Sequence, residues 1–158
     1  MKHIRVFTVL AMSLLAYFGW TALHPQKAAA SDDPSGTFLA TITDANTGAF
    51  SSRSVITLHA DHSMAVVDSG QGGPTVLFSS QQGVWEHDST GMLDARTLDF
   101  SFPNAGIARV DYNFTTINTQ QVSGTITLTV FPLNGNPLDG GGTVVGTFNF
   151  TGTRVTVP

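Results

Sequence analysis

The sequence predicts an all-β protein, an eight- or nine-stranded antiparallel barrel with up-and-down topology. From Ser31 onward, β-branched and aromatic residues alternate with Thr, Ser, Asn and Asp, which is the period of a strand with one buried face. Gly, Pro, Asn and Asp separate these runs, as they do in tight turns. No stretch beyond Ser31 has a convincing helical period. Strands without helices to cover them have to bury their apolar faces against one another.

The first element, residues 1–30, is predicted to be a signal peptide. A positively charged start precedes an apolar run over residues 6–20, and three alanines before Ser31 fit the small-residue pattern that signal peptidase cleaves. We therefore expect cleavage before Ser31, export to the periplasm or the cell exterior, and no membrane association afterwards. A permanent anchor is the alternative, because the apolar stretch 6–23 is 18 residues long.

Residues 31–158 are expected to form one β-barrel domain, and their charge excludes some partners. The chain has 7 basic and 11 acidic side chains and no cysteine. Beyond residue 30 it has no lysine, and 4 arginines against 11 acidic side chains leave a net charge of -7. Such a surface has no basic patch for the phosphates of nucleic acid. The lack of cysteine excludes disulfides, cysteine–zinc sites and thiol nucleophiles.

Alternating runs bounded by turn-forming residues predict nine strands, some of which will merge or fray. They cover residues 37–44, 52–60, 63–68, 75–79, 84–88, 95–102, 107–116, 122–131 and 143–157. The intervening segments are mostly short enough for hairpins, so consecutive strands are expected to pair antiparallel. Such a sheet closes into a barrel, or two sheets pack as a β-sandwich. Rows of large aromatic residues favour the barrel, whose interior has room for side chains or one small ligand.

Residues two apart in a strand share a face, so the alternation also predicts which side chains enter the core. The polar residues between them, Asp99 among these, are expected to face solvent. The expected inward rows are Leu98, Phe100 and Phe102; Val110, Tyr112 and Phe114; Val122, Ile126, Leu128 and Val130; and Val144, Phe148 and Phe150.

Short glycine motifs at both ends of the predicted barrel resemble those of the calycin superfamily. Gly36-Thr37-Phe38 opens the first strand, and Gly152-Thr153-Arg154 ends the last. Lipocalin-like barrels begin with glycine-x-tryptophan and end with an arginine that packs across the tryptophan, whose position Phe38 takes here. The chain is similar to small secreted lipocalin-like bacterial barrels, and in shape to allene oxide cyclase-like enzymes. The resemblance implies a structural role for Phe38 and Arg154, with a charge clamp on a ligand as the alternative.

The inward aromatic residues are the predicted ligand-binding residues, since they would line a cavity if they do not fill it. His87 has the parity of Trp85, so it would lie near Tyr112. There the two would orient the polar end of a ligand or act as an acid–base pair. The alternative is a rim histidine hydrogen-bonded to the backbone. The full predicted set is Trp85, His87, Phe100, Phe102, Tyr112, Phe114 and Phe148.

No metal or cofactor is predicted. His59 and His62 are three residues apart, which puts them on opposite faces of a strand or at a solvated hairpin tip. A metal would need a third ligand such as His87. The sequence also has no Gly-x-Ser-x-Gly elbow, phosphate-binding glycine loop or suitably spaced carboxylate pair.

Three functions remain open on this basis. We favour a secreted barrel that binds a small hydrophobic ligand in its interior. The second is a cofactor-free cyclase or isomerase in which the barrel holds a reactive conformer and His87 or Tyr112 moves a proton. Export argues against this one, and we lean away from an enzyme. The third is a surface-interaction module with a solid core. Cavity volume separates the third from the first two, because aromatic rows fill and line barrels alike.

Overall fold

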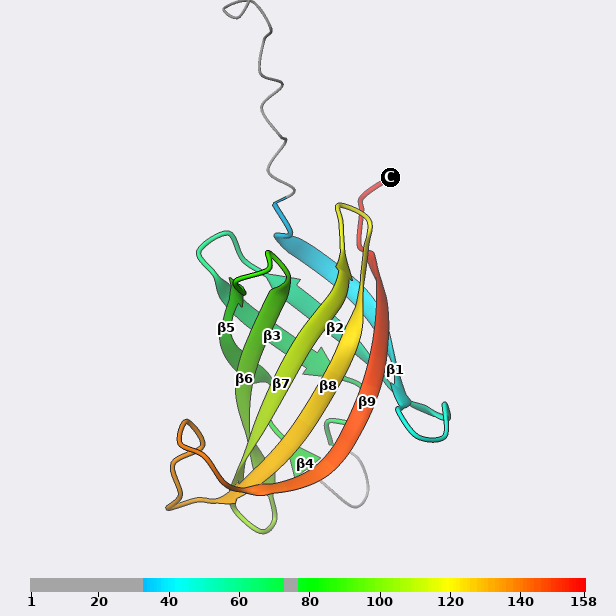
Figure 1. Ribbon diagram of the computed structural model, residues 1–158. Helices are drawn as coiled ribbons and strands as arrows, with labels where there is room; N and C mark the ends of the chain where they lie inside the picture. Colours follow the sequence, from blue (N-terminus) through cyan, green and yellow to red (C-terminus); the bar gives the residue numbers. More distant parts are fainter. Residues whose placement is uncertain (1–32, 73–76) are drawn as a thin grey trace, which may run out of the picture. The chain divides into compact units, whose positions relative to one another are not determined.

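The computed structural model describes residues 33–72 and 77–158, which form an all-β barrel (Figure 1). The predicted signal peptide, residues 1–30, lies outside the described residues, as does the beginning of the expected strand 75–79. Within the described ranges, no helix is long and apolar enough to cross a membrane.

The described part of the chain contains nine strands, and all their pairings are antiparallel. Eight of them close the barrel, because β1 pairs with both β2 and β9 while β6 pairs with both β5 and β7. The short β4 pairs only with the last residues of β6. The predicted up-and-down barrel is confirmed, and the sandwich alternative is wrong. The bounds are β1 Gly36–Asp44, β2 Phe50–Leu58, β3 Ser63–Asp68, β4 Leu77–Phe78, β5 Gln81–His87, β6 Leu93–Phe102, β7 Gly106–Ile117, β8 Gln121–Pro132 and β9 Thr143–Arg154.

The two ends of the barrel differ in their connections. The turns β2–β3, β5–β6 and β7–β8 are short and lie at the end where β1 begins and β9 stops, which we call the closed end (top of Figure 1). The connections β1–β2, β3–β5, β6–β7 and β8–β9 lie at the opposite end, which we call the open end. The β8–β9 loop, residues 133–142, is the longest of the connections that the structure describes in full.

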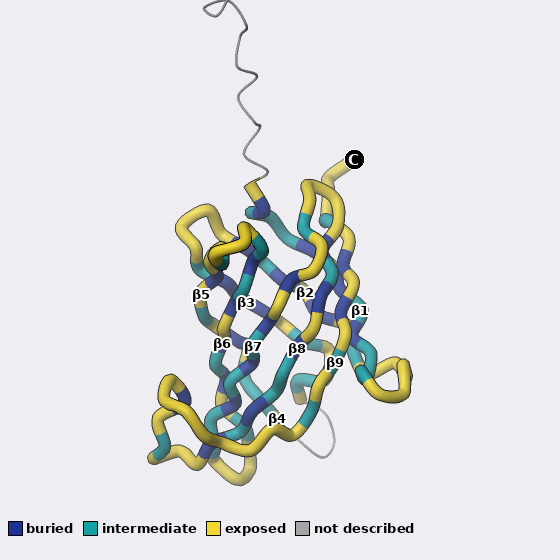
Figure 2. The backbone as a smooth tube through the Cα atoms, in the orientation of Figure 1, coloured by how far each residue is buried: buried dark blue, intermediate teal, exposed yellow. Residues whose placement is uncertain are grey.

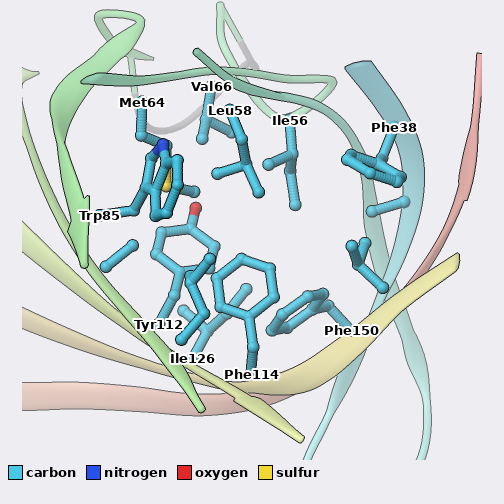
Figure 3. Packing of buried hydrophobic residues seen from close by; sticks show 14 of the residues in the cluster. Phe38, Ile56, Leu58, Met64, Val66, Trp85, Tyr112, Phe114, Ile126 and Phe150 are labelled. Atoms are coloured by element: carbon cyan, nitrogen blue, oxygen red, sulfur yellow. The ribbon is translucent and has the colours of Figure 1, made fainter. Parts of the chain in front are cut away.

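Side chains fill the half of the interior next to the closed end. Figure 3 shows aromatic rings and aliphatic side chains from facing strands turned toward one another. The Phe114 and Phe150 rings meet edge to face, with centroids 5.0 Å apart, and the Tyr112 ring lies 5.9 Å from that of Phe150. This geometry is favourable for aromatic pairs. Buried and exposed residues alternate along the strands, as Figure 2 shows, and the buried side chains of this half form a packed core.

Arg154 covers the core at the closed end. Its guanidinium lies 5.0 Å from the centroid of the fully buried Phe38 ring. The same group donates hydrogen bonds to the backbone carbonyls of Ser35, at 2.8 Å, and of Thr119. One side chain thereby ties the start of β1 to the β7–β8 turn.

We expect Arg154→Met to lower the free energy of unfolding by about 1–2 kcal/mol, because it removes a cation–π contact and two charge-assisted hydrogen bonds at a partly exposed site. Urea denaturation followed by tryptophan fluorescence measures this change. Arg53→Met, at an exposed position of β2, is the matched control and should change stability by less than about 0.5 kcal/mol. Equal effects of the two substitutions would contradict a special role for Arg154.

The inward face predicted for β6 is wrong. Phe100 and Phe102 are 52% and 47% exposed on the outside of the barrel, whereas Thr97 and Asp99 are buried. Cross-strand register is the reason: Ala95 stands opposite Trp85 on β5 and opposite Tyr112 on β7. Directly opposed residues share a face of the sheet. The inward row of β6 therefore runs from the apolar Leu93 and Ala95 to the polar Thr97, Asp99 and Ser101.

The expected inward position of Val144 is also wrong. Register shifts between Leu128 and Thr129 where β8 pairs with β9, so that Leu128 stands opposite Gly146 and Thr129 opposite Val144. The extra residue in β9 is Val145, which is 53% exposed but belongs to the cavity lining, whereas Val144 is 61% exposed and does not. A bulge of this kind reverses the alternation beyond it.

Candidate functional site

The open half of the barrel contains a cavity of about 430 Å³. One of its walls is apolar and comes from β1 and β7–β9, with Phe78 of β4 beside it. The opposite wall is polar and comes from β2, β3, β5 and β6, together with Tyr112 of β7. The apolar residues are Ile42, Phe78, Ala108, Val110, Ile126, Leu128, Val130, Val145 and Phe148, and the polar ones are Ser51, Ser52, Ser54, Asp68, Gln81, Asp99, Ser101 and Tyr112, with Gly70 beside them.

Asp68 is fully engaged by its own neighbours. One of its carboxylate oxygens accepts hydrogen bonds from the hydroxyls of Ser52, at 2.8 Å, and of Ser54. The other accepts the backbone N–H of Gly70 at 2.7 Å. This carboxylate therefore fixes the β2–β3 corner of the polar wall and has few free acceptor positions for a ligand.

Gln81 and Tyr112 form a second satisfied group. The amide oxygen of Gln81 accepts hydrogen bonds from the hydroxyls of Thr97 and Tyr112, each at 2.8 Å. Burial, with the nearby Asp68 and Asp99 carboxylates, raises the pKa of Tyr112 far above its usual range. The phenol therefore stays protonated and donates to Gln81, which orients its ring against the cavity.

Asp99 differs from both groups because nothing in the described chain satisfies it. Its side chain is only 4% exposed, and its buried Oδ1 has no hydrogen-bond partner among the described residues. Burial raises the pKa of Asp99 to about 6, since a carboxylate removed from water without donors resists ionisation. A buried, unpaired carboxyl in a cavity is a functional-site candidate on physical grounds.

The residues predicted to bind a ligand are only partly brought together. Tyr112 and Phe148 line the cavity. Trp85 and Phe114 are buried in the packed core, where the Trp85 indole donates to the carbonyl of His59 at 3.0 Å. Phe100 and Phe102 lie on the outside, as described above.

His87 is exposed and does not reach the cavity. Its Nδ1 lies 3.2 Å from the carbonyl of Gly91, which matches the rim alternative. The ring also contacts the edge of Trp85, with centroids 5.8 Å apart. Its parity is that of Trp85, but β5 ends at this residue, so the side chain lies past the closed end of the interior.

The histidine pair at the β2–β3 turn is not part of a metal-binding cluster. No group of three or more metal-ligating side chains occurs among residues 33–72 and 77–158. His62 instead stacks on the indole of Trp85, with centroids 4.3 Å apart and planes 6° from parallel. It has a φ of 69°, which suits the tight turn.

Sequence reasoning missed the polar wall, above all Asp99, Asp68 and Gln81. A signal was present, because Thr97, Asp99 and Ser101 continue the parity of the apolar Leu93 and Ala95 without a break.

Comparisons of the chain with protein-family models, with curated proteins and with solved structures found no match.

Proposed function

We propose that this protein binds one small amphipathic molecule inside its barrel. The observation that carries the proposal is the cavity of about 430 Å³ with an apolar wall facing a polar wall. Its volume lies within the range of about 300–1,000 Å³ that is usual for small-molecule sites, which are mainly apolar with a few oriented polar groups. The packed core at the closed end bounds this cavity on one side, since its members Ile42, Tyr112 and Ile126 also belong to the lining.

Membership of the calycin superfamily is part of the same proposal. It is supported by the closed eight-stranded antiparallel barrel and by the contact between Arg154 at the end of β9 and Phe38 near the start of β1. A fold of this kind serves many functions, so the ligand is argued from the cavity and not from the family.

The binding proposal is tested by filling the cavity. We expect Ala108→Phe to weaken saturable binding of an environment-sensitive lipophilic fluorophore about tenfold, because Ala108 lines the cavity and the larger ring would occupy it. Fluorescence titration of the protein expressed from its full chain measures the dissociation constant. Thermal unfolding of the same sample shows whether the variant is folded.

The matched control is Ala60→Phe, which adds the same ring at an exposed position of the β2–β3 turn. Wild-type affinity in this control, with weaker binding by a folded Ala108→Phe variant, supports the cavity as the site. Saturable binding that Ala108→Phe leaves unchanged would contradict it, and so would the absence of saturable binding to the wild-type protein across a panel of lipophilic fluorophores.

Export is proposed together with binding. If the chain is exported and cleaved as its first thirty residues indicate, mass spectrometry of the protein recovered from the periplasm or the medium will give Ser31 as the first residue. Recovery of the uncleaved chain from the membrane fraction would support the anchor alternative.

A cofactor-free isomerase or cyclase is the second candidate, and a specific observation favours it. Asp99 is a carboxyl with a pKa of about 6 in a largely apolar cavity, which suits a general base near neutral pH. Asp99 and Tyr112 line the cavity, whereas His87 does not reach it. If a substrate is found, turnover by Asp99→Asn should fall at least a hundredfold, and unchanged turnover would exclude this role.

A further inference from the structure

The charges around the cavity are of one sign. Its lining includes two carboxylates, Asp68 and Asp99, and no lysine, arginine or histidine among the described residues. Arg96 and Arg109, on the neighbouring strands β6 and β7, pair with Asp111 on the outside of the barrel. A carboxylate or phosphate that entered the cavity would therefore meet negative charge with no cation to balance it.

The described hydrogen bonds leave one buried acceptor of the lining without a partner. Asp68 is engaged by Ser52, Ser54 and Gly70, and the Tyr112 hydroxyl is engaged by Gln81. The strongest unsatisfied group is the acceptor Oδ1 of Asp99, which is buried in the polar wall. None of the donors in the lining reaches this oxygen in the described chain, and a donor with positive charge would satisfy both the hydrogen bond and the ion pair.

We propose that the ligand is a cationic amphiphile, a protonated amine whose head group pairs with Asp99 while its hydrocarbon body lies along the apolar wall. The inference rests on the proposed binding function and names the chemical class of the ligand. A neutral alcohol fits less well, because it brings no charge to balance a carboxylate that burial has removed from water. Fatty-acid-like anions are the class that the cavity disfavours most.

The proposal gives binding a defined pH dependence. Asp99 is faced by Asp68 from β3, by Tyr112 from β7 and by the neutral Gln81 from β5, and none of these supplies a positive charge. With its pKa raised to about 6, Asp99 is mostly ionised at pH 7.5 and about nine-tenths protonated at pH 5. An amine stays protonated at both values, so its affinity should fall about tenfold from pH 7.5 to pH 5.

The test compares three probes of one length: octylamine, octan-1-ol and octanoate. Each displaces a lipophilic fluorophore from the protein expressed from its full chain, at pH 7.5 and at pH 5. We expect octylamine to bind at least tenfold more tightly than octan-1-ol at pH 7.5, with octanoate weakest. Asp99→Asn should abolish the preference for the amine and its pH dependence. Asp139→Asn, an equal charge change at an exposed position of the β8–β9 loop, should preserve both.

The outcomes separate this inference from the function on which it rests. If the three probes bind equally, or octanoate binds best, the head-group inference is overturned while binding in the cavity stands. If Asp99→Asn keeps the amine preference, Asp99 is not its partner. If the fluorophore itself shows no saturable binding to the wild-type protein, the proposed function fails and the inference fails with it. The pH profile of the wild-type protein provides a readout that does not depend on the folding of any variant.

Discussion

At pH 7.5 the Asp99→Asn variant is expected to be more stable than the wild-type protein by up to about 3 kcal/mol. The substitution keeps the shape of the side chain and removes a buried charge that no donor compensates. Burial raises the pKa of the Asp99 carboxyl from 3.8 to about 6. Between these pH values the folded state therefore binds a proton that the unfolded state has already lost. Such a group lowers stability as pH rises through this interval.

The sign of this effect makes it easy to separate from ordinary acid denaturation. Below about pH 4, Asp99 is protonated in both states and the variant should have no advantage; the advantage should grow between pH 4 and pH 6 and then level off. Four other aspartates have lowered pKa values, mainly because hydroxyl and backbone N–H groups two or three residues on donate to them, but they titrate alike in both proteins. They are Asp33, Asp44, Asp61 and Asp88.

Urea denaturation of both proteins from pH 4 to pH 8 measures the difference. Asp139→Asn serves again as the control and should track the wild-type protein at every pH. A variant that is less stable than the wild-type protein at pH 7.5 would contradict an uncompensated charge at Asp99. A residue that lowers stability at its own position is typical of a site kept for function.

Gly124→Ala is expected to destabilise the protein by about 3 kcal/mol, the upper end of the usual range for overpacking. A β-carbon at this position would lie 2.0 Å from the carbonyl oxygen of Asn113 and 2.9 Å from the Cα of Phe114. Both atoms belong to the main chain of β7, so rotation of a side chain cannot relieve the contact. The close approach occurs beside a register shift, after Phe114, at which β7 bends around the core.

Thermal and urea unfolding of Gly124→Ala and Gly140→Ala provide the comparison. Gly140 lies in the β8–β9 loop, where an added β-carbon meets no atom within 4 Å. Its substitution should therefore change stability by less than about 0.5 kcal/mol. Near-equal stabilities of the two variants would show that β7 and β8 can separate at Gly124 without loss of packing.

The barrel architecture could be predicted from the sequence because it depends on patterns within single strands and the turns that join them. Alternation over two residues and turn-forming residues between runs specify antiparallel strands, and the absence of helices leaves a closed barrel or a β-sandwich as the ways to bury them. Trp85, Tyr112 and Phe114 are buried as the alternation predicts, since no bulge interrupts their strands before these positions. These are properties of single strands and their nearest neighbours.

The candidate site depended on relations between strands, and the sequence alone did not supply them. Alternation in β6 gives two faces but does not say which is inside, and the aromatic residues Phe100 and Phe102 favoured the wrong one. Only the pairing of Ala95 with Trp85 and Tyr112 decides it, and this pairing places Asp99 in the cavity. In β9, the inward face is also set by pairing, because one extra residue opposite β8 reverses the alternation at Val145.

The division between a packed closed end and a hollow open end has a consequence for how this protein can change. Side chains such as Ala108, Val130 and Val145 line the cavity but belong neither to the aromatic core nor to the contact between Arg154 and Phe38. Substitutions there can alter the shape of the cavity with little risk to folding. Natural variation, or a laboratory library confined to these positions, can therefore change which ligand the cavity binds while the rest of the barrel stays the same.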